Sequence, residues 1–101
     1  MLILIPMTGT DPDRDHIAPI YEAASWALVD FDEGMVKSTT FFDDRHATGA
    51  AWIDFVILAN RFENYMEFME EGMMVLSVRH ERTIEEIIEA FKFKELDEVG
   101  L

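Results

Sequence analysis

Two short and almost wholly apolar runs constrain the fold of this chain more than any other feature. The first covers residues 2–6 and stops before Thr8 and Gly9, and the second covers residues 52–59, in which Asp54 is the only charged residue. Short runs without polar alternation are typical of strands that are buried on both faces. Such strands need helices on the sheet to cover them, so the two runs predict buried strands of an α/β sheet.

The segment between these runs has the pattern of a β-hairpin. Residues 25–31 are compatible with a strand, and a short acidic turn, Asp32-Glu33-Gly34, follows them. Glycine accepts a positive φ at little cost, as a tight hairpin turn requires. Met35–Phe42 is then the returning strand, near an edge of the sheet. We expect one or two helical turns in residues 17–24, before the hairpin, and a loop or one frayed turn in residues 43–51, after it.

An amphipathic helix is expected from about Arg61 to Glu71. Apolar side chains recur there at spacings of three, four and seven residues, namely Phe62, Tyr65, Met66 and Met69. The other face carries four carboxylates that we expect to be solvated, namely Glu63, Glu67, Glu70 and Glu71. Gly72 follows as a helix stop with positive φ, and residues 73–78 are expected to form the next strand.

The last helix begins at Thr83. Thr83 and Glu86 have the spacing of a capping box, and apolar residues then repeat at Ile84, Ile87, Ile88 and Phe91. The predicted order is strand, short helix, strand, strand, loop, strand, helix, strand, helix. A hairpin followed by alternating strands and helices implies a mixed, partly parallel sheet of five strands that is flanked by helices.

Composition bounds the size and the partners of the protein. A chain of 101 residues, half of them hydrophobic, is expected to form a single domain, residues 1–101. Eight basic and 21 acidic residues give a net charge of −13, which argues against nucleic acid and anionic membranes as partners. The chain has no cysteine to hold a disulfide, a zinc ion or an iron–sulfur cluster. No apolar run approaches the ~18 residues of a membrane span, and we expect a cytoplasmic location.

Histidine and arginine occur together in three predicted loops. The groups are Arg14 with His16, Arg45 with His46, and Arg79 and Arg82 with His80. If these loops converge, their imidazoles and guanidiniums would suit an anionic ligand or a metal cluster. Separate solvated loop residues are the alternative. No nucleophile, base and orienting residue can be named together, so we do not expect an enzyme.

Six segments form an ordered pattern along nearly the whole chain. They are Ile17-Ala18-Pro19-Ile20-Tyr21-Glu22-Ala23, Leu28-Val29-Asp30, Asp32-Glu33-Gly34, Asp54-Phe55-Val56-Ile57, Glu71-Gly72-Met73-Met74-Val75, and Thr83 to Phe91. In this order and spacing they resemble the dinitrogenase iron-molybdenum cofactor biosynthesis family. The resemblance implies a ribonuclease H-like, three-layer α/β fold in which the second strand runs antiparallel to the others.

Family members with a known role bind or carry the iron-molybdenum cofactor of nitrogenase, or its iron-sulfur precursor. The resemblance therefore implies a small non-enzymatic carrier or accessory protein whose partner is a metallocluster-handling protein. Ligands of such sheets bind beyond the carboxyl ends of the strands. The loop residues expected nearest that site are His16, Arg45, His46, Asn60 and Arg61. The alternative is a cofactor-free protein interaction module that has lost the site.

The predicted edge strand, Met35–Phe42, also suggests self-association. It is rich in β-formers, and Lys37 is its only obvious edge-blocking residue. Strand alternation places Phe41 and Phe42 on opposite faces, which leaves one of them for solvent or a second subunit. We expect a homodimer through this strand, and we expect it to be tighter at higher salt because each subunit carries a charge of −13.

Overall fold

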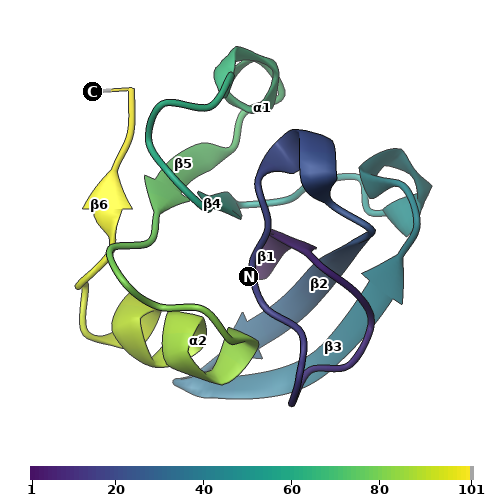
Figure 1. Cartoon of the computed structure of the whole chain (residues 1–101), viewed down its shortest axis with the longest axis vertical. Helices are drawn as coiled ribbons and strands as arrows, with labels where there is room; N and C mark the ends of the chain where they lie inside the picture. The colour runs from purple at the N-terminus through teal and green to yellow at the C-terminus, as the bar shows by residue number, and fades with distance from the viewer. Residues whose placement is uncertain (101) are drawn as a thin grey trace.

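Strand β1 (Leu2–Met7) lies inside a six-stranded mixed sheet of order β3-β2-β1-β4-β5-β6 in the computed structural model, which describes residues 1–100 (Figure 1). The other strands are β2 (Ser25–Asp32), β3 (Met35–Phe42), β4 (Phe55–Leu58), β5 (Met74–Ser77) and β6 (Asp97–Glu98). β1 pairs in parallel with β4, and β4 pairs in parallel with β5. Both apolar runs of the sequence therefore supply adjacent interior strands, as predicted.

β2 and β3 form the predicted hairpin. The two residues between them, Glu33 and Gly34, have φ values of 51° and 76°, the positive pair that a two-residue hairpin turn needs. β2 runs antiparallel to both β1 and β3, which confirms the predicted direction of the second strand. β3 consequently forms one edge of the sheet.

The sheet contains a sixth strand that the sequence did not predict. β6 has only two residues, and it pairs antiparallel with Leu76 and Ser77 of β5. A strand of two residues is too short to show an alternating pattern. It is held in place by the residues on either side of it, because Leu96 packs into the core on one face of the sheet and Val99 into the core on the other.

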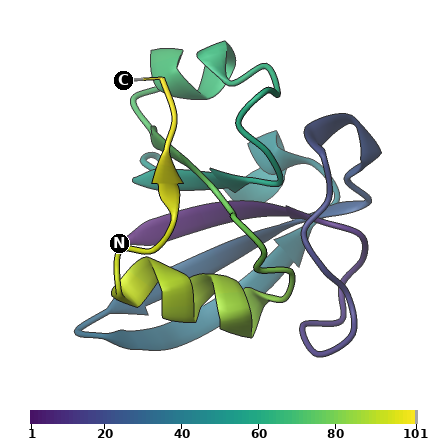
Figure 2. The ribbon, with the colours of Figure 1, turned by 60° about the vertical axis from the view of Figure 1, so that its left-hand side comes forward.

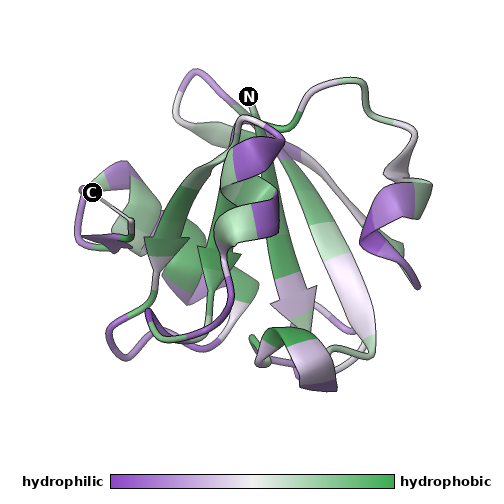
Figure 3. Cartoon of the chain, turned by 90° about the horizontal axis from the view of Figure 1, so that it is seen from above, coloured by the Kyte–Doolittle hydropathy of each residue, from purple (hydrophilic) through white to green (hydrophobic). Residues whose placement is uncertain are grey.

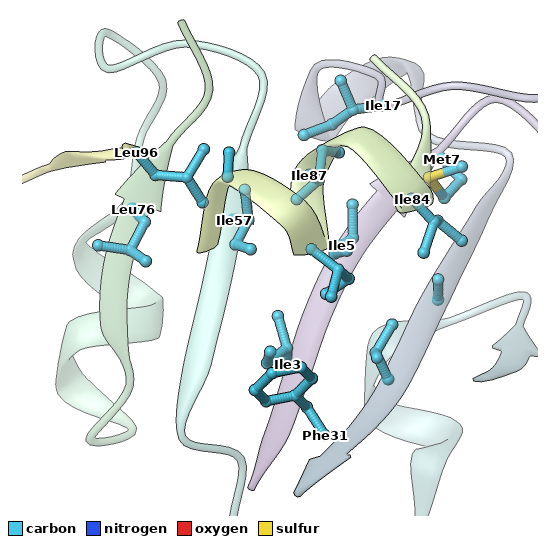
Figure 4. Close-up of a cluster of buried hydrophobic side chains, with 14 residues drawn as sticks. Ile3, Ile5, Met7, Ile17, Phe31, Ile57, Leu76, Ile84, Ile87 and Leu96 are labelled. Carbon is cyan, nitrogen blue, oxygen red and sulfur yellow. The ribbon is translucent and has the colours of Figure 1, made fainter. Parts of the chain in front are cut away.

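Helix α2 (Ile84–Lys92) covers one face of the sheet, and the core beneath it is shown in Figure 4. Ile3, Ile5 and Met7 of β1 are fully buried there. From the helix, Ile84 and Ile87 pack onto them. This helix and its capping box are confirmed, since the Thr83 hydroxyl accepts the Glu86 amide while the Glu86 carboxylate accepts the Thr83 amide.

Helix α1 (Met66–Glu70) covers the opposite face, so that the sheet lies between the two helices (Figure 2). The alternate side chain of β1, Leu4, points to this second core, where Phe68 of α1 is 2% exposed. Figure 3 shows the hydrophobic strands in the middle of the molecule and the polar residues in the loops around them. Within residues 1–100, no helix is long and apolar enough to cross a membrane.

α1 is much shorter than the predicted helix, which was expected to begin at about Arg61. The Asn60 side-chain oxygen accepts the Phe62 amide, and the Glu63 carboxylate accepts the amides of Asn60 and Ile20. These side chains offer the backbone an alternative to helical bonds. Phe62 is consequently 89% exposed instead of lying on an apolar face. The expected end of the helix is confirmed, since Gly72 has a φ of 89°.

Candidate functional site

A cleft of about 490 Å³ lies where the chain leaves the carboxyl ends of β1, β3 and β4, on the α1 side of the sheet. Ligand sites of α/β sheets commonly occupy this position. The loop after β1 contributes the 3₁₀ turn η1 (Ile20–Glu22), and the segment after β3 contributes the 3₁₀ turn η2 (Arg45–Thr48). The cleft is lined by Ile20, Tyr21, Arg45, Asn60, Phe62, Glu63, Asn64, Glu67 and Phe68.

Arg45 is the only buried cation in the described part of the chain, with 9% of its surface exposed. Its guanidinium donates to both carboxylate oxygens of Glu71, at 3.2 and 2.6 Å, and to Glu67 at 2.5 Å. It also lies over the ring of Phe68, 4.3 Å from the ring centre. Burial alone would lower the pKa of Arg45, but the bonds to Glu71 and Glu67 more than offset this effect and raise it. The guanidinium is therefore fully engaged within the protein.

The carboxylates of this region are structural rather than merely solvated. The bond from Arg45 lowers the pKa of Glu71 below its ordinary range, although Glu71 remains 39% exposed. Glu67 binds the same guanidinium, and Glu63 ties the amides of Ile20 and Asn60 together across the cleft. Glu67 and Glu71 are exposed, as expected of a solvated face, but they and Glu63 also bind groups of the protein, which was not predicted. The glutamate spacing did not indicate that Glu67 and Glu71 bind Arg45, which comes from a distant loop.

The predicted site residues are only partly brought together. Arg45 and Asn60 line the cleft, and His46 lies beside it with its Nε2 atom 3.6 Å from a Glu67 carboxylate oxygen. Arg61 is exposed and lies outside the cleft lining. His16 is also outside the lining, and its Nδ1 atom lies 3.0 Å from the Ile17 carbonyl oxygen.

Two aromatic residues at the cleft were missed by the sequence reasoning. Tyr21 is 85% exposed and Phe62 is 89% exposed, although both line the cleft. The helical spacing of Phe62 from Met66 predicts a place on the apolar face of a helix, and the structure does not have that helix at Phe62. Large exposed aromatic side chains beside carboxylates give the cleft an acidic and aromatic character, which differs from that of a basic anion site.

The donor atoms of this region do not fit a tightly held metal cluster. The chain has no cysteine. Within residues 1–100, no three or more His, Asp or Glu side chains are grouped so that they could hold a metal ion. The one buried guanidinium that would suit an anionic cluster already binds two carboxylates. Residues 1–100 thus contain no grouped set of His, Asp or Glu ligands for such a cluster.

Comparisons with solved structures identify the fold. A protein from Methanocaldococcus jannaschii, provisionally named a dinitrogenase, superimposes with a TM-score of 0.76 for its crystal structure, at 20% identity over 99% of this chain and 95% of that one. Its NMR structure gives a TM-score of 0.79, at 21% identity over 100% of this chain and 94% of that one. A Thermotoga protein, provisionally named a NifB protein of the DUF35 family, gives 0.71 at 18% identity over 96% of this chain and 91% of that one.

The fold is shared. At identities of 16% to 21%, this similarity covers the arrangement of strands and helices along nearly the whole chain. No family model and no curated protein matches the sequence. The chain thus has the fold of proteins whose names associate them with nitrogenase.

Proposed function

We propose that this protein is a small non-enzymatic accessory protein that acts as a cofactor-free interaction module, and that its partner is a second copy of the same chain. The observation that carries this proposal is the edge strand β3. The two outer strands of the described sheet are β3 and β6, and β6 has only two residues. β3 presents eight residues with no neighbouring strand on its outer side in the described chain. An exposed strand edge is a template for pairing with another strand.

The carboxyl half of β3 is the part suited to pairing. The register between β2 and β3 shifts at Asp30, so that Lys37 is the extra residue of a bulge. A bulge and a lysine both oppose pairing at a sheet edge. Beyond the bulge, residues 38–42 pair regularly with β2 and contain no charge. Phe41 packs against the α2 core and Phe42 is half-buried.

A second copy fits this edge because an antiparallel pair of identical strands is closed by a two-fold axis. Two β3 strands centred on Thr40 would join the two sheets into one continuous sheet. The charge of −13 on each copy opposes association, and salt screens this repulsion. The dimer is therefore expected to be tighter at high salt.

Sedimentation at micromolar concentration and several salt concentrations tests this proposal. The variant Thr40→Glu would place two like charges opposite each other in the dimer, and it should be monomeric where the wild-type protein is dimeric. Thr10→Glu is the matched control, because Thr10 is exposed in a loop outside β3. A wild-type monomer at every salt concentration, or equal weakening by both variants, would refute the proposal.

The non-enzymatic part of the proposal is supported by the way the buried hydroxyl groups are bonded. The hydroxyl of the buried Ser25 donates to the Gly9 carbonyl at 2.5 Å. His46 and His80 each have the Nε2 atom 3.6 Å from a carboxylate oxygen, of Glu67 and Glu81 respectively. In the described residues, hydroxyl groups donate to carboxylates at two places, from Thr8 to Asp15 and from Thr83 to Glu86. Each of these hydroxyls also accepts a backbone amide, in a loop and in a helix cap, so both pairs are accounted for by local backbone structure.

A carrier of the iron-molybdenum cofactor, or of its iron-sulfur precursor, is the second candidate function. It is favoured by the names of the proteins that share the fold and by the presence of Arg45 and Asn60 in one cleft. A metallocluster-handling protein would then be the partner. Reconstitution with an iron-sulfur cluster separates the two candidates, because only the carrier retains the cluster.

A further inference from the structure

A second cavity shares no lining residue with the cleft described above. It has a volume of about 660 Å³ and opens between the end of α2 and the sheet, near the amino end of β1. It is lined by Met1, Phe31, Gly34, Phe55, Leu76, Phe91, Lys92, Phe93, Lys94, Leu96 and Glu98. A mainly apolar cavity of this size with a few polar groups is typical of a site for a small organic molecule.

The floor of this cavity is a preformed aromatic surface. The ring of Phe91 meets Phe31 edge to face with centres 5.6 Å apart, and it meets Phe55 in the same way at 4.9 Å. Leu76 and Leu96 are each 8% exposed beside these rings. These side chains belong to three strands and to α2 and its carboxyl end, so the apolar surface is held by the fold itself.

The charges at the cavity point to an anionic ligand. Lys92 and Lys94 are two of the three lysines in a chain with a net charge of −13, and both line the cavity. Lys92 has only a 3.8 Å contact with Glu89, whose side chain is 63% exposed, so this contact neutralises it weakly. Glu98 is the only acidic residue in the lining. The cavity is thus locally cationic in a strongly acidic protein.

The backbone at Lys94 is a second indication. Helix α2 ends with bonds from the Lys94 amide to the Phe91 carbonyl and from the Glu95 amide to the Ala90 carbonyl. Lys94 has a φ of 57°, the left-handed conformation in which glycine is favoured after a helix. In this conformation a lysine makes the fold less stable than a glycine would. Such a loss of stability is expected where a side chain serves binding.

We propose that this cavity binds a small organic anion with an apolar body, of the class of aromatic or aliphatic carboxylates. The apolar part would lie against the Phe91 ring and the two leucines, and the acid group would lie near Lys92 and Lys94. This assignment is independent of the proposed role of β3 and of the cleft at the other end of the sheet. No covalent step is involved.

Two fluorescent dyes of similar shape test the proposal. One is the anionic 8-anilinonaphthalene-1-sulfonate and the other is the uncharged N-phenyl-1-naphthylamine. Lys92→Gln/Lys94→Gln should weaken binding of the anionic dye about tenfold, as expected for the loss of two exposed ion pairs, and binding of the neutral dye about twofold or less. Lys37→Gln is the matched control, because it removes the third lysine, which lies on β3 outside the cavity.

Amide NMR shifts locate the bound dye in the folded protein. Binding in the cavity should move the signals of Leu76, Phe91 and Leu96 and leave that of Asn60 unchanged. Glu98→Gln should strengthen binding of the anionic dye, because it removes the acidic residue of the lining. The proposal is overturned if neither dye binds, or if Lys37→Gln weakens binding of the anionic dye as much as the double variant does. It is also overturned if the amide shifts map to the cleft around Asn60.

Discussion

Replacing Arg45 with methionine tests whether the contact between η2 and α1 stabilises the fold. Methionine retains apolar contact with Phe68 but removes the guanidinium that binds Glu67 and Glu71. If these bonds hold the loop after β3 against α1, Arg45→Met must lower the free energy of unfolding. The arginine would then have a structural role, and it would not be free for a ligand.

The size of the effect follows from the exposure of the three groups. Breaking a fully buried ion pair costs about 3–5 kcal/mol, and breaking an exposed pair costs about 0.2–1 kcal/mol. Arg45 is buried, but the side chains of Glu71 and Glu67 are 39% and 65% exposed and return to water when the arginine is lost. We therefore expect Arg45→Met to cost about 2 kcal/mol, with a coupling of about 1 kcal/mol to Glu71 and less to Glu67.

Urea unfolding, followed by the fluorescence of the buried Trp26, measures these free energies. A double-mutant cycle of Arg45→Met and Glu71→Gln isolates the coupling. The matched control is Glu70→Gln, because Glu70 lies on the same helix and no hydrogen bond or ion pair of its side chain is seen within residues 1–100. The structural role of Arg45 would be refuted by a coupling energy between Arg45 and Glu71 that is near zero, or that equals the coupling energy between Arg45 and Glu70.

Three further perturbations have defined outcomes. Thr83→Ala removes the capping box of α2 and should cost about 1 kcal/mol in urea unfolding, whereas an unchanged midpoint would contradict the cap. Lys94→Gly should add about 0.5–1 kcal/mol of stability because of its positive φ, and a loss of stability would contradict this reasoning. The pKa of Glu71 is lower in the folded state than in the unfolded state. The contribution of Glu71 to the free energy of unfolding is therefore complete above its unfolded-state pKa of about 4.3, and it is lost as the pH falls through the folded-state pKa. The stability difference between wild type and Glu71→Gln should therefore be smaller at about pH 3 than at pH 7, and an equal difference would contradict the assignment.

Strands β1 to β5 and helix α2 could be predicted because their signals are local. Strand β1 is apolar on both faces, with Ile3 and Ile5 on one face and Leu4 on the other. The Thr83 cap marks the start of α2 within four residues. The start of α1 could not be predicted in the same way. The apolar spacing predicts a helix there, but the side chains of Asn60 and Glu63 accept backbone amides instead. Asn60 accepts the nearby amide of Phe62, and Glu63 accepts the distant amide of Ile20.

The site was less predictable than the fold because it depends on contacts between distant segments. Arg45 and Glu71 are 26 residues apart, and nothing in either neighbourhood indicates that they pair. The position of Asn60 after a parallel strand did predict its place in the cleft. His16 was expected near the same site but lies outside the lining, because its own loop folds back through a bond between its amide and Thr8. β6 was missed because two residues show no periodicity.

Anaerobic reconstitution with an iron-sulfur cluster, followed by desalting and iron analysis, tests the cofactor-free interaction module most directly. We expect the wild-type protein to leave the column without iron and without the visible absorption of a cluster. We also expect no difference in iron content between the wild-type protein and the variants His16→Ala, His46→Ala and Asn60→Ala. Stoichiometric iron in the wild-type protein that is lost in His46→Ala or Asn60→Ala would contradict the account and establish the carrier function instead.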